Sequence, residues 1–319
     1  MRSVIISNLV YGEPYTTVFL ELHLKSLLEN FNQVALGENS MYLIYTDGSN
    51  IGKITDHRSY KSLSSIMQVQ FIKIDDQLNY QGRYHAQTLQ FQHSIKIALE
   101  RNSLMHQACA DIYYGSNFWS NSFQLLAKHN ANGLFGFAIR TTLESTYDVL
   151  RVGYFDNDSL FEIGYSNIHP IWSFANWESP YFTKYPYTFL WSSPDQIVCR
   201  AFSIPPIIFE PTDKMMAASG CGDISVLPLC ERIYIERDWQ ILPMLEVGMM
   251  QAFFPPFSTQ RSSVEKLVAW ARRHLPAENH ANLVHYQVIK KRDTVIDQSL
   301  IEESSIVCKK IMEQLASPF

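Results

Sequence analysis

Four side chains in the second half of the chain are of types that could move a proton to or from a substrate. Asp223, Glu236, Asp238 and His169 carry carboxyl or imidazole groups, which are the usual general acids and bases of enzymes. Asp223 follows Gly220-Cys-Gly222, a flexible turn that would let the backbone approach a substrate closely. The alternatives stay open, because Glu236 and Asp238 also suit a solvated strand end, and His169 could be a hydrogen-bonded structural histidine.

Two residues near the N-terminus are of types that bind nucleosides. Asp47 follows the apolar run Met41–Tyr45 and precedes Gly48. A carboxylate there could accept hydrogen bonds from a base N–H group or a ribose hydroxyl, although an Asp-Gly pair also forms an ordinary turn that needs no ligand. Tyr11 could stack on a base, or it could pack on the protein as a plain loop tyrosine.

Three cations could neutralise a diphosphate. Arg83, Arg140 and Lys184 are the candidates, since a guanidinium binds phosphate in bidentate fashion and an ammonium supplies a point charge. Each of them could equally be an ordinary surface ion.

Aromatic side chains are dense between residues 156 and 210, and they make up 13% of the whole chain. Trp172, Trp177 and Trp191 could stack on the apolar faces of sugar rings. Most aromatics of this stretch should nevertheless belong to the core, because each buries about 150–250 Å².

Composition and missing motifs exclude several function classes. The 26 basic residues are outnumbered by 31 acidic ones, and no basic block is present, which argues against general binding to nucleic acid or to anionic membranes. The glycine-rich dinucleotide and phosphate loops, Gly-x-Ser-x-Gly and His-Glu-x-x-His are absent, so dehydrogenases, P-loop NTPases, α/β-hydrolases and zincins lose their sequence support.

The cysteines and the apolar segments indicate a cellular location. The five cysteines contain no pair at the spacing of a zinc site, so we expect reduced thiols. The first ten residues lack the apolar centre of a signal peptide, and no run of about 18 apolar residues occurs. We therefore expect a cytoplasmic protein without a transmembrane segment.

The first 150 residues alternate between strand-like and helix-like patterns. We expect strands at residues 3–7, 41–45, 69–74, 111–114 and 133–141, and helices at about 20–31, 84–101 and 121–128. This alternation predicts an α/β fold, a mainly parallel twisted sheet with helices on both faces. Ligands of such sheets bind at the carboxyl ends of the strands, which points to loops 8–15, 46–50 and 115–121.

The second half of the chain does not continue the alternation of strand-like and helix-like patterns. Residues 156–210 suggest an irregular aromatic-rich insertion, and residues 197–209, interrupted by two prolines, suggest an edge strand. We expect a short strand at 233–235, a capping box at Ser262-x-x-Glu265 that opens a helix, and a last helix over 297–315.

The order of several short segments resembles bacterial GT-A-type nucleotide-sugar glycosyltransferases. The similarity is carried by Val4–Ser7, Tyr11–Tyr15 and Tyr42–Asp47, then by Tyr84 with Ala110–Ser116, and by the segment from Ser203 to Asp238. It covers about two thirds of the chain.

The resemblance implies a Rossmann-like sheet, a nucleotide-sugar donor and a saccharide acceptor, with transfer in the assembly of a surface polysaccharide or glycan. It implies a nucleotide-sugar-binding half over 1–150, an acceptor half over 151–255 and a helical segment over 256–319. The nucleotide-binding candidates are then Tyr11, Gly12, Asp47, Arg83, Tyr84, Ser116, Asn117 and Arg140, with the three tryptophans on the acceptor side.

The chain departs from this pattern at the metal loop. The family places an Asp-x-Asp pair there, whereas this chain has Tyr114–Asn117, and Asp111 comes earlier, inside the expected strand. Either the enzyme neutralises the diphosphate without Mg²⁺ or Mn²⁺, or it binds nucleotide sugars poorly. The sequence thus implies no firm metal cofactor, and leaves open a catalytically degenerate nucleotide- or glycan-binding or assembly partner, as well as a homo-oligomer.

Overall fold

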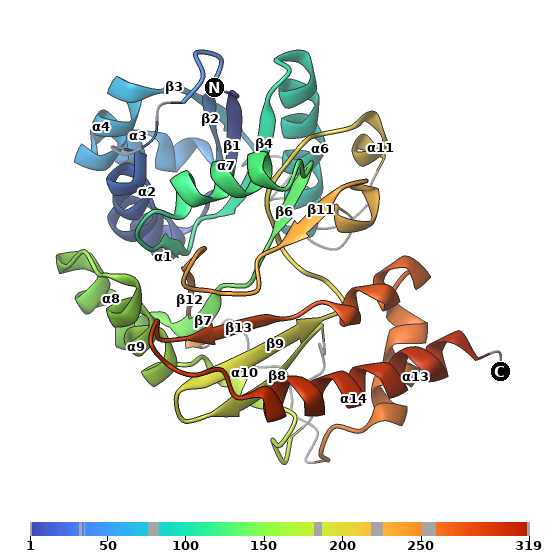
Figure 1. The fold of residues 1–319 in the computed structure, drawn as a ribbon. Coiled ribbons are helices and arrows are strands. Elements are labelled where there is room, and N and C mark those ends of the chain that lie inside the picture. Colours follow the sequence, from blue (N-terminus) through green and yellow to red (C-terminus); the bar gives the residue numbers. More distant parts are fainter. Residues whose placement is uncertain are drawn as a thin grey trace. The chain divides into compact units, whose positions relative to one another are not determined.

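The chain divides into two units. The computed structural model describes residues 2–31, 34, 36–75, 83–181, 187–217, 226–250 and 260–317 (Figure 1). The first unit comprises Met1–Phe135, Tyr147–Tyr154 and Pro205–Tyr234, and the second Gly136–Thr146, Phe155–Ile204 and Ile235–Phe319. Each unit thus combines segments that are distant in the sequence, unlike the consecutive segments with boundaries at 150 and 255 that the sequence suggested. Which segments bind donor and acceptor stays a prediction.

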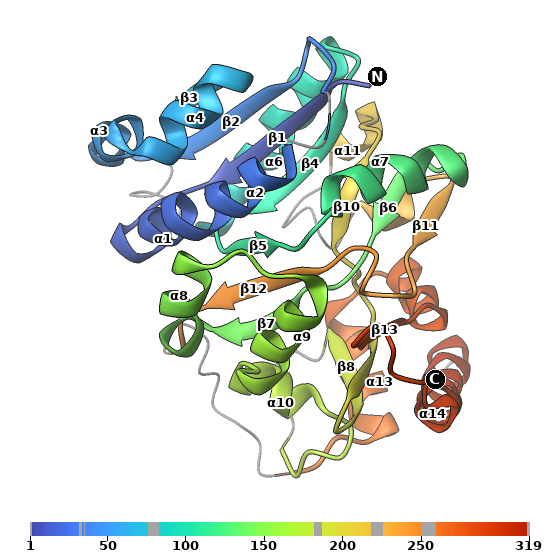
Figure 2. The same cartoon turned by 60° about the vertical axis from the view of Figure 1, so that its left-hand side comes forward.

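A seven-stranded sheet forms the centre of the first unit. Its order is β11-β6-β10-β4-β1-β2-β3, and β4, β1, β2 and β3 run parallel (Figure 2). The predicted α/β class with a mainly parallel sheet is confirmed. The strands are β1 (Val4–Leu9), β2 (Met41–Thr46), β3 (Gln68–Lys73), β4 (Leu104–Cys109), β6 (Gly133–Phe135), β10 (Pro206–Phe209) and β11 (Ile233–Ile235).

Helices pack on both faces of this sheet. Successive side chains of a strand point to opposite faces, so neighbouring residues of β1 contact different helices. Ser7 of β1 bonds to α6 (Arg83–Glu100), accepting from Gln90 Nε2 at 2.9 Å and from Ser94 Oγ at 2.8 Å. The neighbouring Asn8 faces the other way and reaches the N-terminal helical run through Tyr42.

The N-terminal helical run has a π-helical turn in its middle. It consists of α1 (Glu13–Val18), the π turn η1 (Phe19–His23) and α2 (Leu24–Phe31). The predicted apolar stripe is confirmed, since Leu20, Leu24 and Leu27 are all buried.

Further helices lie where the sequence suggested turns or polar linkers. They are α3 (Gly48–Asp56), α4 (Arg58–Ile66), α8 (Leu143–Val152), α11 (Asp213–Met216) and η2 (Leu227–Leu229). The expected Asp-Gly turn is therefore the start of α3. The helix predicted over 121–128 is confirmed as α7 (Phe118–Lys128) and begins three residues earlier.

The expected strand over 111–114 is wrong in its bounds. The central strand is β4, which the sequence did not predict, and only the short β5 (Ile112–Tyr114) follows. Residues 110 and 111 form the turn between them, so Asp111 lies outside any strand.

The second unit contains two groups of strands. One is the antiparallel sheet β13-β9-β8, of β8 (Thr188–Ser193), β9 (Gln196–Ala201) and β13 (Gln287–Lys290). The other is the parallel pair β7 (Ile139–Thr142) and β12 (Met244–Gly248). Its helices are α9 (Asn157–Ser166), α10 (Pro170–Ala175), α13 (Val264–His274), η4 (Ala277–Val284) and α14 (Gln298–Ala316).

Three expectations for the second half are corrected. Much of the supposedly irregular stretch 156–210 is regular, because it contains α9, α10, β8, β9 and β10. The expected edge strand is two strands, and β10 lies between β4 and β6, which its proline tolerates because Pro206 is the first residue of the strand. Ser263, not Ser262, caps α13, by accepting from Lys266 N at 3.3 Å.

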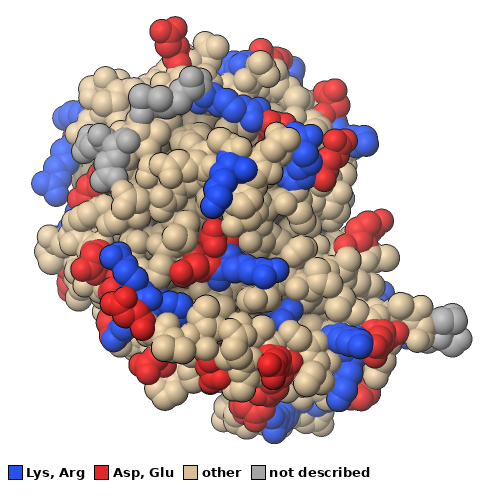
Figure 3. All heavy atoms as spheres, in the orientation of Figure 1, with Lys and Arg blue, Asp and Glu red and all other residues tan. Residues whose placement is uncertain are grey.

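Among the residues that the structure describes, no helix combines the length and the apolar character needed to cross a membrane. On the face shown in Figure 3, acidic and basic side chains are interspersed.

Candidate functional site

The strand order contains a reversal beside β1. From β1 the chain builds β2 and then β3 on one side, and later places β4 on the other side of β1. Leu9 and Cys109 are register partners, so the carboxyl ends of β1 and β4 lie side by side. Open α/β sheets bind ligands at such a topological switch point, where the two outgoing loops diverge.

The segment after β1 leaves its backbone accessible. Gly12 has φ +77°, and no heavy atom lies within 4 Å of the position that a Cβ would take. Its carbonyl accepts hydrogen bonds from Thr16 N and Thr16 Oγ1, both at 3.0 Å, which fixes the start of α1. Tyr11 beside it is half-buried. A ligand can therefore approach Gly12 more closely than a residue with a side chain would allow.

The segment after β4 carries Asp111 in a turn. Asp111 is 9% exposed, and Cys109, two residues before it, is exposed and forms no disulfide. Asp111 lies outside a strand because β4 ends where its parallel pairing with β1 ends, which is a tertiary contact. Asp111 therefore lies at the switch point, where the sequence had expected the strand interior.

The predicted metal loop lies just downstream of this turn. Ser116 is half-buried, and the exposed Asn117 adopts φ 63° as the residue before α7. Neither residue supplies a carboxylate, as the sequence had indicated.

Three polar side chains of the N-terminal helical run hold the β5 segment in place. His23 Nδ1 donates to Ile112 O at 2.9 Å, and Ser26 Oγ accepts from Tyr114 N at 3.1 Å. Asn30 Nδ2 donates to Gly115 O at 3.0 Å. Their spacing of three and four residues places them on one helix face. Sequence reasoning missed them, although buried polar residues within an apolar helical stripe were a readable signal.

Two buried histidines of the first unit share one arrangement. His23 Nδ1 donates to the carbonyl of Ile112, and its Nε2 lies 2.9 Å from Tyr42 Oη. His106 likewise bonds the carbonyl of Ile207 through Nδ1, and its Nε2 lies 2.7 Å from Tyr114 Oη. Burial lowers the pKa of His23 to about 3 and that of His106 to about 4, so both imidazoles are neutral.

Asp47 is the N-cap residue of helix α3. Its carboxylate accepts from Asn50 N at 3.2 Å, from Asn50 Nδ2 at 2.6 Å and from Ser49 Oγ. Burial raises the pKa of this carboxyl, but the hydrogen bonds from Ser49 and Asn50 outweigh that effect and lower it. A nucleoside role for Asp47 stays a prediction, and the observed role is that of a helix cap.

A second carboxylate at the same sheet edge was missed. Asp75 follows β3 and accepts from Gly48 N at 2.9 and 3.2 Å through its two oxygens. An acidic residue directly after the third predicted strand was the signal that could have found it.

Several predicted residues lie elsewhere. Arg140 belongs to the second unit, where it stands opposite Glu246 in the β7–β12 pair and forms an ion pair with it. Asp223 and Lys184 fall outside the described residues, as do the side chains of Arg83 and Tyr84.

His169 uses both ring nitrogens within the protein. It is 1% exposed, its Nδ1 accepts from Ile171 N at 3.2 Å, and its Nε2 donates to Met249 O at 3.4 Å. Burial lowers its pKa, which favours the neutral ring.

The two carboxylates after β11 fold back on the backbone. Glu236 Oε1 accepts from Asp238 N at 3.0 Å, and Asp238 Oδ1 accepts from Gln240 N at 3.0 Å. Glu236 is buried and Asp238 is half-buried, so Asp238 is the more accessible of the two.

The three tryptophans differ in accessibility. Trp172 is 8% and Trp191 2% exposed, and Trp191 belongs to the core under α13 and α14. Trp177 stacks on Trp191 with ring centroids 5.8 Å apart and is only partly buried. Of the three, Trp177 is therefore the most accessible for stacking on a sugar ring.

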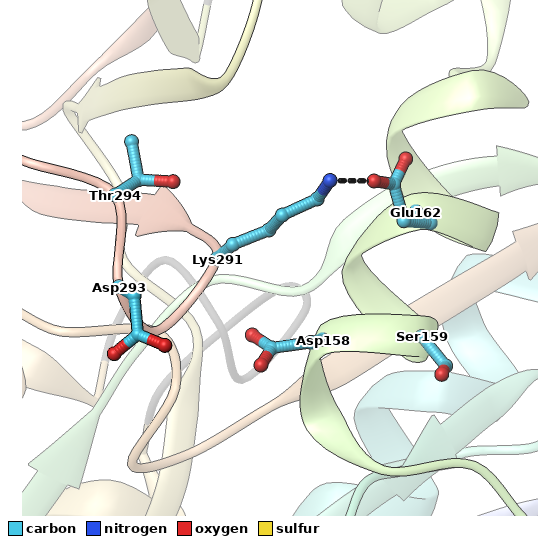
Figure 4. A pocket seen from close by; sticks show the side chains of 6 residues that line it. All are labelled: Asp158, Ser159, Glu162, Lys291, Asp293 and Thr294. Carbon is cyan, nitrogen blue, oxygen red and sulfur yellow. Dashed lines mark ion pairs between the residues drawn. The ribbon is translucent and has the colours of Figure 1, made fainter.

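A polar pocket of about 480 Å³ lies in the second unit, and its lining includes none of the predicted site residues (Figure 4). Lys291 reaches across it to pair with Glu162, and Asp158 Oδ1 accepts from Gln240 Nε2 and Arg292 N at 3.0 and 2.8 Å. Three of its charged side chains, Lys291, Glu162 and Asp158, thus have partners within the protein. It is lined by Asp158, Ser159, Glu162, Lys291, Asp293 and Thr294.

Within the described ranges, no group of three or more His, Cys, Asp or Glu side chains is placed to hold a metal ion. At the switch point, Asp111 is the carboxylate that the turn supplies.

No protein-family model and no curated protein matches the chain. Among solved structures, S. aureus TarS 1-349 in complex with UDP-GlcNAc is 10% identical over 99% of this chain and 71% of that chain, with a TM-score of 0.41. Mannosyltransferase PcManGT from Pyrobaculum calidifontis, in complex with GDP-Man and Mn²⁺, is 12% identical over 100% and 76%, with a TM-score of 0.39. Mouse xyloside xylosyltransferase 1 is 13% identical over 43% and 52%, with a TM-score of 0.27. The chain is similar to these proteins at this level, and no residue role is taken from them.

Proposed function

We propose that the first unit binds a nucleotide sugar at the carboxyl ends of β1 and β4, and that the protein transfers the sugar to a saccharide acceptor. The observation that carries the proposal is the switch point itself, with the open backbone at Gly12 beside the Asp111 turn. The order of sequence segments that resembles GT-A enzymes supports the same placement.

The donor's parts have separate partners in this proposal. The diphosphate lies along the backbone after β1, where Gly12 leaves room, and Tyr11 stacks on the base. Ser116 and Asn117 border the sugar-phosphate side from the loop that Asn30 holds. Arg83, Tyr84, Asp47 and Arg140 remain candidates for the nucleotide, and Trp172, Trp177 and Trp191 for the acceptor.

The described residues do not form a metal centre, so no step of the proposal uses a divalent ion. We propose that backbone N–H groups and cations neutralise the diphosphate. Turnover should then persist in EDTA. Full activity with Mn²⁺ together with none in EDTA would contradict this part.

The acceptor hydroxyl must lose its proton during transfer. Asp223, Glu236, Asp238 and His169 remain the candidates for the general base. Substituting each one, to Asn, Gln, Asn and Gln respectively, should identify the base as the variant that loses kcat while its thermal shift with nucleotide is unchanged.

Thermal unfolding in the presence of UDP, GDP, dTDP and CMP tests nucleotide binding. A nucleotide at 100 times its Kd should add about 2.7 kcal/mol to the free energy of unfolding. The Gly12→Ala variant should lose this nucleotide-dependent gain, because its methyl group occupies the open space beside the backbone. Gly52→Ala is the matched control, since Gly52 also faces open space but lies within helix α3.

The absence of a carboxylate at 115–117 favours a second candidate, a nucleotide- or glycan-binding partner without turnover. This candidate predicts the thermal gain without any release of nucleotide diphosphate in the presence of saccharide acceptors. If none of the four nucleotides stabilises the protein, the nucleotide-sugar proposal is wrong.

A further inference from the structure

The second unit buries an arginine that forms no ion pair with a carboxylate of the described residues. Arg200 of β9 is 3% exposed. Its five N–H donors are matched by five neutral oxygens: the hydroxyls of Ser304 and Ser305 and the carbonyls of Leu283, Val284 and Ile301, at 2.5–3.4 Å. The hydrogen bonds satisfy the donors, but the positive charge remains, because a guanidinium stays protonated in proteins.

A second cation lies close to the first. Arg237 is exposed, and its guanidinium carbon lies 5.0 Å from the ring centroid of Tyr286. The guanidinium carbon of Arg200 lies 5.1 Å from the same centroid. His285 is adjacent in sequence and half-buried, and the charges of both arginines act on it.

Within the described part of the chain, no acidic side chain forms an ion pair with this cluster. None of the ion pairs found there involves Arg200, Arg237 or His285. Burial lowers the pKa of His285 most, and both arginines lower it further, with no carboxylate acting in the opposite direction. Two like charges that share one tyrosine ring repel each other, and burial of Arg200 weakens the screening by water.

We propose that Arg237, His285 and Tyr286 form an anion site of the second unit, which binds a phosphate group with Arg200 as a buried source of positive potential. The exposed guanidinium of Arg237 presents its donors to solvent in the fork geometry that phosphate oxygens match. In this proposal, His285 and the Tyr286 hydroxyl are the further donors. The site is independent of the nucleotide-sugar proposal, which concerns the first unit.

Phosphate fits this cluster better than a carboxylate does. Two cations without counter-ions favour a ligand of nearly two negative charges over a ligand of one. Acetate should therefore bind more weakly than inorganic phosphate at equal ionic strength.

Binding of inorganic phosphate, measured by calorimetric titration at constant ionic strength, tests the proposal. Arg237→Gln should weaken phosphate binding about tenfold or more, the value of one lost charge-assisted contact. Arg237→Lys should fall between it and the parent protein, because it keeps the charge and loses the fork. Arg273→Gln is the matched control, since Arg273 is an exposed arginine of the same unit.

Three results would overturn the proposal: no phosphate binding by the parent protein, equal binding by Arg237→Gln, or equal affinities for acetate and phosphate. If phosphate binds at the nucleotide site instead, its binding should be weaker in Gly12→Ala and unchanged in Arg237→Gln. The test therefore distinguishes failure of this site from failure of the proposed function.

Discussion

The buried histidines of the first unit and the buried Arg200 of the second unit respond to burial in opposite ways. In the first unit, His23 and His106 lose their charge on burial, and each pairs its two nitrogens with one carbonyl and one tyrosine hydroxyl. In the second unit, Arg200 keeps its charge and satisfies five donors with neutral oxygens. An imidazole can give up its proton within the accessible pH range and a guanidinium cannot.

This difference has functional consequences. The two buried imidazoles of the first unit are neutral, so the stability of this unit should respond to acid. The second unit holds a fixed positive charge that acid does not change, and that charge is what the proposed phosphate site uses.

The largest expected effect is the loss of stability of the first unit in acid. The folded-state pKa values of His23 and His106, about 3 and about 4, lie below the unfolded value, so the unfolded chain binds more protons below about pH 6.5. The free energy of unfolding should fall by about 4 kcal/mol from pH 7 to pH 5 through these two groups. Hydrogen exchange of the β1 and β4 amides measures it in this unit.

A pair of variants tests whether the buried histidines cause this loss of stability in acid. His23→Gln should remove about half of the pH-dependent change, whereas His129→Gln should leave it unaltered because His129 is exposed. Equal protection of β1 and β4 at pH 7 and pH 5 would mean that these histidines are not held neutral by burial.

The next effect concerns the charged group of the second unit. Arg200→Leu should cost about 3 kcal/mol, because it leaves the carbonyls of Leu283, Val284 and Ile301 without a donor. Urea unfolding monitored by exchange of the β9 amides measures this loss. Arg237→Leu should change stability by less than about 0.5 kcal/mol, since that side chain is exposed.

A loss as small for Arg200→Leu as for Arg237→Leu would show that the five hydrogen bonds do not connect β9 to η4 and α14. The pH dependence of unfolding should be the same in Arg200→Leu as in the parent, because the guanidinium does not titrate in this range.

The smallest effect tests a neutral hydrogen bond of the first unit. Asn30→Ala should cost about 1 kcal/mol by removing the donor to Gly115 O, a bond that lies at 3.0 Å in the buried interior. It should also weaken nucleotide binding, because the loop from Gly115 to Asn117 loses its support. Thermal unfolding with and without nucleotide measures both.

Ser120→Ala provides the comparison, since its exposed hydroxyl bonds Asn117 O of the same loop at 3.0 Å. If the two variants weaken nucleotide binding equally, the buried amide has no special role in positioning the loop.

Local patterns were enough to predict much of the first unit. The apolar strands β1 and β2 and the helix α6 follow from side-chain periodicity, which depends only on nearby residues. The choice of the loops after β1 and β2 as candidate ligand-binding loops, with Tyr11, Gly12 and Asp47, follows from the rule that ligands bind at the carboxyl ends of parallel strands.

The central strand shows where local patterns fail. β4 contains His106, which interrupts its apolar pattern, and the partners that make this histidine acceptable, Ile207 O and Tyr114 Oη, come from elsewhere in the chain. Missing β4 also misplaced Asp111, which the end of that strand sets in a turn.

The sequence by itself determined the class of fold and the strand ends at which a ligand is expected, because burial of apolar faces acts over a few residues. Only the tertiary structure decided that β10 enters the sheet beside β4, that Arg140 pairs with Glu246, and that Arg200 and Arg237 share Tyr286. Those contacts join residues far apart in the chain, and a buried polar group selects its partners by geometry that no local pattern encodes.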